Sequence, residues 1–129
     1  MLNSSLAVAF GSAVGGVLRF WLTDLVARVW PTHLPVGTLL VNVTGSFAIG
    51  ALAATFLDRG HASATTVWPA LLMTGLLGGF TTFSAFSLQT LLLMQQGRWV
   101  DASANVALSV LLCLAAVWLG WHAGMIHQG

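Results

Sequence analysis

Polar side chains interrupt the apolar segments of this chain in three places. Two of these groups recur every four residues and so follow one helix face, namely Thr38, Asn42 and Ser46, and then Asn105, Ser109 and Cys113. A polar side chain in hydrocarbon needs a partner or a water-filled cavity. If the segments that carry them span a membrane, these groups therefore predict a hydrated path.

The third group combines hydroxyl and aromatic side chains directly after a run of glycines. Gly75, Gly78 and Gly79 are followed by Thr81, Thr82, Ser84 and Ser87, interleaved with Phe80, Phe83 and Phe86. Hydroxyl groups donate hydrogen bonds, and the ring edges of phenylalanine carry partial positive charge. Such a neutral lining favours dehydration of a small anion without binding it too tightly to leave. The alternative is that small residues only let helices pack closely, as in Gly11-x-x-x-Gly15 and Gly75-x-x-x-Gly79.

The charged residues favour an anion over a cation as the permeant species. The carboxylates of Asp24, Asp58 and Asp101 lie near span ends or in connections, so no acid is available mid-membrane to bind a cation or carry a proton. Arg19 is the one ionisable group well inside an apolar segment, and an unpaired guanidinium facing water would attract anions. The alternative for Arg19 is snorkelling to the interface with a structural hydrogen-bonding role.

The segments that carry these residues predict an all-α membrane protein. Of the 129 residues, 57% are hydrophobic and only 5% are charged, with a mean hydropathy of +0.90, whereas a soluble domain has roughly 25% charged residues. A membrane helix takes about 20 apolar residues. We therefore expect a single integral membrane domain over residues 1–129, with four spans at about residues 6–29, 38–57, 68–96 and 102–124.

The third span is expected to be broken by Gly78-Gly79. A break frees backbone carbonyls, which survive at membrane depth only where protein or a cavity satisfies them. Carbonyls that face each other across a dimer axis would suit a small cation. A simple glycine kink is the alternative. After this span, Asp101 is expected to be the N-cap of the fourth helix.

The arginine count gives almost no preference for one orientation in the membrane. Arg59 and the N-terminal amine lie on one side, and Arg28 and Arg98 lie on the other, joined by Arg19 if it snorkels that way. From charge alone, insertion in both orientations with pairing into an antiparallel dimer and a single oriented form are equally compatible with the sequence.

Several other classes of protein are disfavoured. The net charge of +1 comes without a basic run, so nucleic acid is not an expected partner. No nucleophile–base pair or metal-ligand cluster can be assembled, and the glycine run lacks the Lys of a phosphate loop, so we expect no enzyme. Cys113 is the only cysteine, which leaves no disulfide framework. The histidines lie at or beyond span ends: His33, His61, His122 and His127.

Two motifs resemble the signature pair of the Fluc family of fluoride channels, also called CrcB. They are Gly37-Thr38-Leu39-Leu40-Val41-Asn42 in the second span and Gly78-Gly79-Phe80-Thr81-Thr82-Phe83-Ser84-Ala85-Phe86-Ser87 in the third. The resemblance covers essentially the whole chain, including the length, the four spans, an Arg late in the first helix and Gly-Arg after the third. It implies antiparallel, dual-topology homodimers in the bacterial plasma (inner) membrane. Two pores per dimer would let fluoride leave the cytoplasm passively and so reduce its toxicity.

The resemblance also implies roles for individual residues. Phe83 and Phe86 match the pore phenylalanines, and Arg19 matches the vestibule arginine. The remaining pore positions are Asn42, Thr82, Ser84, Ser109 and Cys113. The backbone carbonyls of Gly78 and Thr81, taken from both subunits, match those that hold a structural sodium ion. The chain departs from the family pattern at Ala85, Gln89 and Asn105, where other members have Thr, Glu and Tyr.

Two rival functions remain from the sequence. A small multidrug antiporter shares four helices and dual topology, but it needs a membrane-embedded Glu and this chain contains none. A non-transporting membrane assembly subunit would use the glycines and hydroxyls for packing alone.

Overall fold

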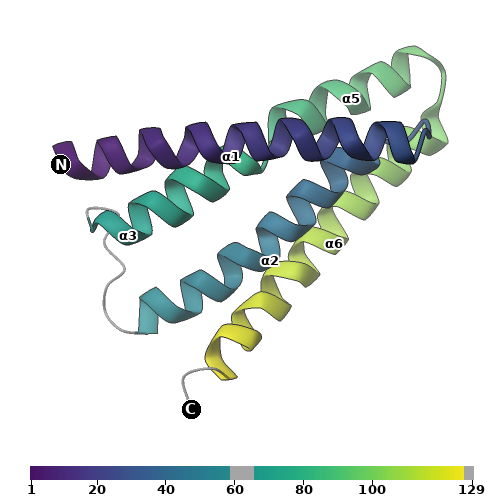
Figure 1. Ribbon diagram of the computed structural model, residues 1–129. Helices are drawn as coiled ribbons and strands as arrows, with labels where there is room; N and C mark the ends of the chain where they lie inside the picture. The colour runs from purple at the N-terminus through teal and green to yellow at the C-terminus, as the bar shows by residue number, and fades with distance from the viewer. Residues whose placement is uncertain (59–65, 127–129) are drawn as a thin grey trace.

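The computed structural model describes residues 1–58 and 66–126, which form a series of helices (Figure 1). In chain order these are α1 (Leu2–Val29), α2 (Val36–Asp58), α3 (Val67–Pro69), the π-helix η1 (Ala70–Leu77), α4 (Gly78–Phe80), α5 (Phe83–Gln95) and α6 (Trp99–Ile126). Residues 59–65 of the expected connection between the second and third spans, among them Arg59 and His61, lie outside the described residues, as does His127.

Four helical segments among the described residues are long and apolar enough to cross a membrane: Leu2–Val29, Val36–Phe56, Val67–Gln95 and Trp99–Ile126. The expected all-α class with four membrane-length segments is therefore confirmed. The helices run beyond the apolar stretches from which they were predicted, beginning at Leu2 and Trp99 instead of near residues 6 and 102. Continuing a helix satisfies the backbone polar groups internally, which favours long helices near a membrane.

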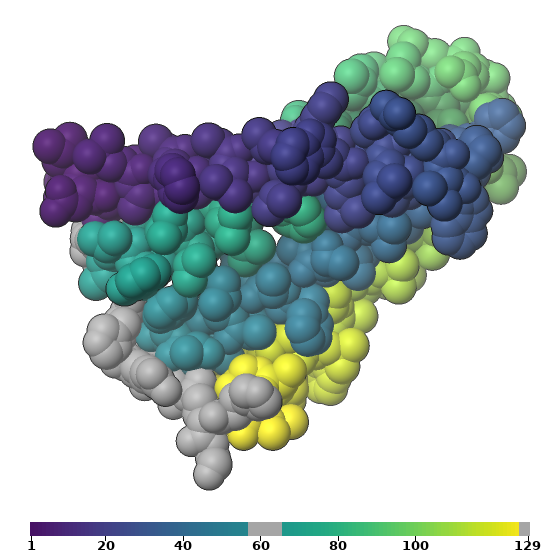
Figure 2. All heavy atoms as spheres, in the orientation of Figure 1, coloured from purple at the N-terminus to yellow at the C-terminus, as the bar shows by residue number. Residues whose placement is uncertain are grey.

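The helices pack in two pairs, with α5 diverging from both. α2 packs along α6, and α1 packs along η1 and α4. Figure 1 shows α5 turning away from η1, and in the space-filling view its atoms extend beyond α1 at one end of the molecule (Figure 2). The break in the third span therefore places α5 where a continuous helix would not go.

Glycines allow the backbones of both pairs to approach closely, whereas the packing interpretation named only Gly11-x-x-x-Gly15 and Gly75-x-x-x-Gly79, which lie in the pair formed by α1 with η1 and α4. A Cβ atom on Gly15 would clash with the carbonyl oxygen of Leu76 in η1. In the other pair, a Cβ atom on Gly120 of α6 would clash with the carbonyl oxygen of Phe47 in α2. Small residues at helix contacts are the usual means of packing helices in lipid.

We expect Gly15→Ala to destabilise the fold by about 1–3 kcal/mol, because the new methyl group must push α1 away from η1. Gly16→Ala is the matched control, since a Cβ atom there meets nothing within 4 Å in this chain. Thermal unfolding in detergent, followed by size exclusion, would compare the two. Equal stability of the two variants would show that the close contact is dispensable.

The third span is interrupted, but not at the glycines. Gly78 is helical, with φ −63° and ψ −35°, whereas Thr81 and Thr82 are extended, with ψ of 158° and 114°. The expectation that Gly78-Gly79 forms the break is therefore wrong. Gly79 serves close packing instead, because its Cβ would lie 2.5 Å from the Ser12 carbonyl oxygen. The preceding η1 is a π-helix, a form that often accompanies functional sites in helices.

The end of the third span also differs from the expectation in one detail. Gly97 adopts φ +73°, a left-handed conformation that favours glycine and ends the helix. α6 then begins at Trp99, so Asp101 lies inside its first turn and is not the N-cap. The Asp101 carboxylate instead accepts a hydrogen bond from Arg98 Nε at 2.7 Å.

Candidate functional site

Most of the residues predicted to carry function meet around the break in the third span, where Asn42 of α2 holds Thr82. Asn42 Nδ2 donates to the Thr82 carbonyl at 3.0 Å, and Asn42 Oδ1 accepts from the Thr82 N–H at 2.7 Å. One carboxamide thus pairs both backbone polar groups of an extended residue. This pairing matters at membrane depth, where an unpaired backbone group costs several kcal/mol.

The Asn42 contact also changes the environment of the Gly78 carbonyl. In a continuous α-helix the N–H of residue i+4 donates to the carbonyl of residue i, so Thr82 would donate to Gly78. Asn42 takes that N–H instead. The Gly78 carbonyl therefore loses its ordinary helical donor.

The Thr81 carbonyl loses its ordinary donor in the same way. Thr82 Oγ1 is the N-cap of α5 and accepts from the Ala85 N–H at 3.1 Å. In a continuous helix the Ala85 N–H would donate to the Thr81 carbonyl. Two carbonyls near the break, those of Gly78 and Thr81, are thus deprived of the donors that a helix would supply.

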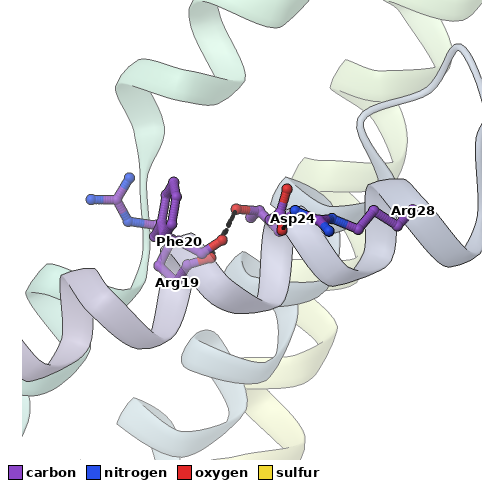
Figure 3. Close-up of polar contacts among 5 residues, drawn as sticks. Arg19, Phe20, Asp24 and Arg28 are labelled. Atoms are coloured by element: carbon purple, nitrogen blue, oxygen red, sulfur yellow. Dashed lines mark hydrogen bonds and ion pairs between the residues drawn. The ribbon is translucent and has the colours of Figure 1, made fainter.

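Arg19 of α1 reaches the same break from the other side. Its Nε donates to the Gly79 carbonyl at 3.1 Å, so Arg19 does have a structural hydrogen-bonding role. Figure 3 shows its guanidinium directed away from Asp24, which forms an ion pair with Arg28 at 2.7 Å. A cation at the C-terminal end of α4 also suits the negative end of the helix dipole.

A cleft of about 430 Å³ opens beside the break. Among the predicted site residues, it is lined by Asn42, Gly78, Thr81, Thr82, Phe83, Phe86, Ser109 and Cys113. Arg19 and Ser84 do not line it. Ser84 is exposed, and its Oγ lies 3.3 Å from Thr82 Oγ1 at the edge of the site. The structure therefore gathers polar groups from α2, α5 and α6 around one space.

Two aromatic rings flank this cleft. The ring centroids of Phe83 and Phe86 are 5.4 Å apart, and their planes are inclined by 49°. The Phe83 side chain is 79% exposed in the single chain, although the residue is large and apolar. Tilted rings present edges as well as faces, so partial positive charge is available to an anion in the cleft.

The sequence interpretation missed the apolar part of the lining. It consists of Gly45, Ile49, Met73, Leu77, Val110 and Leu114, joined by the polar Ser46 that the first row of polar residues had indicated. Helical spacing could have identified some of these residues. Met73, Leu77 and Thr81 are four residues apart, so residues on the face of Thr81 were predictable once Thr81 was chosen.

Two other predicted polar residues lie elsewhere. Thr38 is buried beside a separate pocket of about 200 Å³, which Gln89 also lines. Gln89 Oε1 is buried and has no hydrogen-bond partner among the described residues. Asn105 is buried and donates to Thr90 Oγ1 at 2.8 Å, and Thr90 in turn donates to the Phe86 carbonyl at 2.7 Å. Asn105 thus connects α6 to the helix that carries the phenylalanines.

No group of three or more His, Cys, Asp or Glu side chains that could hold a metal ion occurs among the described residues. Neutral oxygen atoms are the donors that the break offers to a cation, and backbone carbonyls are among them. The carbonyls of Gly78 and Thr81 suit this, because their usual hydrogen-bond donors are used by Asn42 and by Thr82 Oγ1.

Comparison with known proteins points to one family. Residues 6–121 match the profile of the CrcB-like protein family, described as Camphor Resistance (CrcB). A protein of Paramagnetospirillum magneticum named fluoride-specific ion channel FluC is 50% identical over 119 residues, covering 92% of this chain and 93% of that protein. Proteins with the same name from Rhodospirillum rubrum and Campylobacter jejuni are 47% and 44% identical, over 96% and 94% of this chain and 97% of each relative.

Proposed function

Since this chain belongs to the CrcB family, we propose that it is a fluoride-specific ion channel of the bacterial membrane. Its four membrane-length helices make it a multi-pass membrane protein. The observation that carries the proposal is the cleft, which joins two phenylalanine rings to neutral hydrogen-bond donors beside a helix break. An ion channel belongs to no enzyme class.

The chemistry of the cleft suits a small, strongly hydrated anion. The N-terminus of α5 lies at Thr82 and Phe83, and the positive end of its dipole favours negative charge. Phenylalanine edges and the hydroxyl of Ser109 would replace part of the hydration shell. No lysine or arginine among the described residues lines the cleft to trap the anion. Weak, neutral contacts of this kind are what fast passage requires.

An antiparallel, dual-topology homodimer with two pores is part of the proposal. Phe83 lines the cleft and is largely exposed in the single chain, so a second chain packed against it would complete the wall of the cleft. The charges leave insertion in either orientation open, because Arg28 and Arg98 on one side face Arg59 and the N-terminal amine on the other.

A structural sodium ion at the centre of this dimer is the cofactor we propose. Unwound backbone carbonyls at membrane depth commonly coordinate sodium. The N–H groups that a helix would direct to the Gly78 and Thr81 carbonyls bind Asn42 and Thr82 Oγ1 instead. Two carbonyl oxygens per chain are therefore left for a cation to bind. Sodium would supply fixed positive charge that holds the two breaks together.

The function is tested by fluoride efflux from liposomes that contain the purified protein. Nothing in the cleft couples transport to protons or ATP, so we expect a current that reverses at the fluoride equilibrium potential. At 100 mV, inside negative, each anion gains about 2.3 kcal/mol by leaving. Absence of efflux would favour the non-transporting assembly subunit. A reversal potential that follows the proton gradient would instead indicate a coupled antiporter.

A further inference from the structure

We infer that Asn42 is a positioning residue, which fixes Thr82 in an extended conformation and thereby sets where α5 and its two phenylalanine rings lie. The inference rests on the proposed fluoride conduction for one of its readouts. The family resemblance places Asn42 at a pore position, which implies only that its side chain lines the path of the ion. The contacts of its side chain indicate a second task.

The two hydrogen bonds of Asn42 both end on the backbone of one residue. A carboxamide has one acceptor oxygen and two N–H donors. The oxygen takes the Thr82 N–H at 2.7 Å, and one N–H is given to the Thr82 carbonyl at 3.0 Å. One N–H therefore remains for an ion in the cleft.

The position of Thr82 determines the position of the rings. Thr82 is the last extended residue, Phe83 begins α5, and Phe86 lies one turn later. Without Asn42, both polar groups of the Thr82 backbone would lose the partners they have among the described residues. Thr82 would then no longer be held in its extended conformation, and α5 with its two rings would lose its fixed direction.

Hydrogen–deuterium exchange of the protein in lipid nanodiscs tests this directly, with overlapping peptides that isolate the Thr82 amide. Asn42→Leu keeps the shape of the side chain and removes both bonds. We expect exchange at Thr82 to rise at least about tenfold, while peptides from the α2–α6 contact keep their wild-type rates. Asn42→Asp keeps the acceptor of the Thr82 N–H but removes the N–H that donates to the Thr82 carbonyl, so exchange at Thr82 should rise by less than in Asn42→Leu.

Ser46→Ala is the matched control, because Ser46 lines the same cleft one turn along α2. It should leave exchange at Thr82 unchanged. Fluoride and chloride flux provide the second readout. Asn42→Leu should lower the ratio of fluoride flux to chloride flux at least about tenfold. We expect this because the positions of the two rings set the difference between the energy barriers for fluoride and chloride, and the flux ratio depends exponentially on that difference. Loss of folded protein alone would lower both fluxes equally.

The outcomes separate the possibilities. Unchanged exchange at Thr82 in Asn42→Leu, with flux lost, would make Asn42 a fluoride ligand only and overturn the inference. Faster exchange in all peptides would also overturn the inference, because it would indicate general destabilisation of the protein. If the Leu variant does not fold, faster exchange at Thr82 in Asn42→Asp than in Ser46→Ala supports the positioning role of Asn42, and equal exchange in the two variants overturns it. A wild-type protein without fluoride flux would refute the proposed function. The comparison of exchange rates would still test whether Asn42 positions Thr82.

Discussion

Replacing Phe83 or Phe86 with isoleucine is expected to lower fluoride flux to roughly one-hundredth of the wild-type rate or less, since about 2.7 kcal/mol of added barrier has that effect. The two rings lie 5.4 Å apart and line the cleft between α2 and α5. Isoleucine fills a similar apolar volume but has no polarised ring edge to face an anion. Fluoride-electrode recordings of efflux from liposomes would measure the effect.

The control for this experiment is Phe10→Ile. Phe10 lies on α1, is 68% exposed and does not line the cleft, so its replacement should leave flux unchanged. Size exclusion of each variant would confirm that it is folded. Wild-type flux in both Phe83→Ile and Phe86→Ile would refute the assignment of the rings to the pore.

The number of membrane-length helices and the face shared by several site residues were predictable from the sequence. The length of the apolar segments decides the number of helices, and helical periodicity decides which residues share a face. Neither property depends on which residues meet in the folded chain. Phe83 and Phe86 are three residues apart and so lie on one side of α5, whereas Ser84 is rotated by about 100° from Phe83. This rotation is the reason that Ser84 is exposed beside the cleft instead of lining it.

The location of the break was not predictable by the same means. Glycine serves two purposes in membrane helices, namely conformational freedom and close packing, and its presence does not say which one applies. Gly79 lies against the backbone of Ser12, so its role is close packing. At the break, the Thr82 N–H donates to Asn42, 40 residues earlier, and we infer that this contact fixes where the break lies. A preference that depends on a distant residue leaves no local signal.

Gly78→Val is expected to weaken the proposed dimer at least about tenfold, or about 1.4 kcal/mol. Within one chain the substitution has room, because the nearest atom to a Cβ at Gly78 is the Met73 carbonyl oxygen at 3.9 Å. The loss would therefore arise between the chains, where the branched side chain would obstruct the carbonyl that we propose for sodium. Thr81→Ser keeps both the carbonyl and the hydroxyl, which donates to the Leu77 carbonyl at 2.9 Å, so it should change dimer strength less than about twofold.

Sodium dependence makes this prediction specific to the ion. A ligand that binds only the dimer stabilises it by RT ln(1 + L/Kd), which grows with the ligand concentration L. The wild-type dimer should therefore weaken when sodium is replaced by a large organic cation, and the Gly78→Val dimer should no longer respond. Gly16→Val is the matched control, since Gly16 has equally open space but lies on α1, away from the cleft. Analytical size exclusion over a range of protein concentrations would measure all four proteins. If Gly78→Val dimerises like the wild type and keeps its response to sodium, the carbonyl of Gly78 is not a ligand, even in a channel that conducts fluoride.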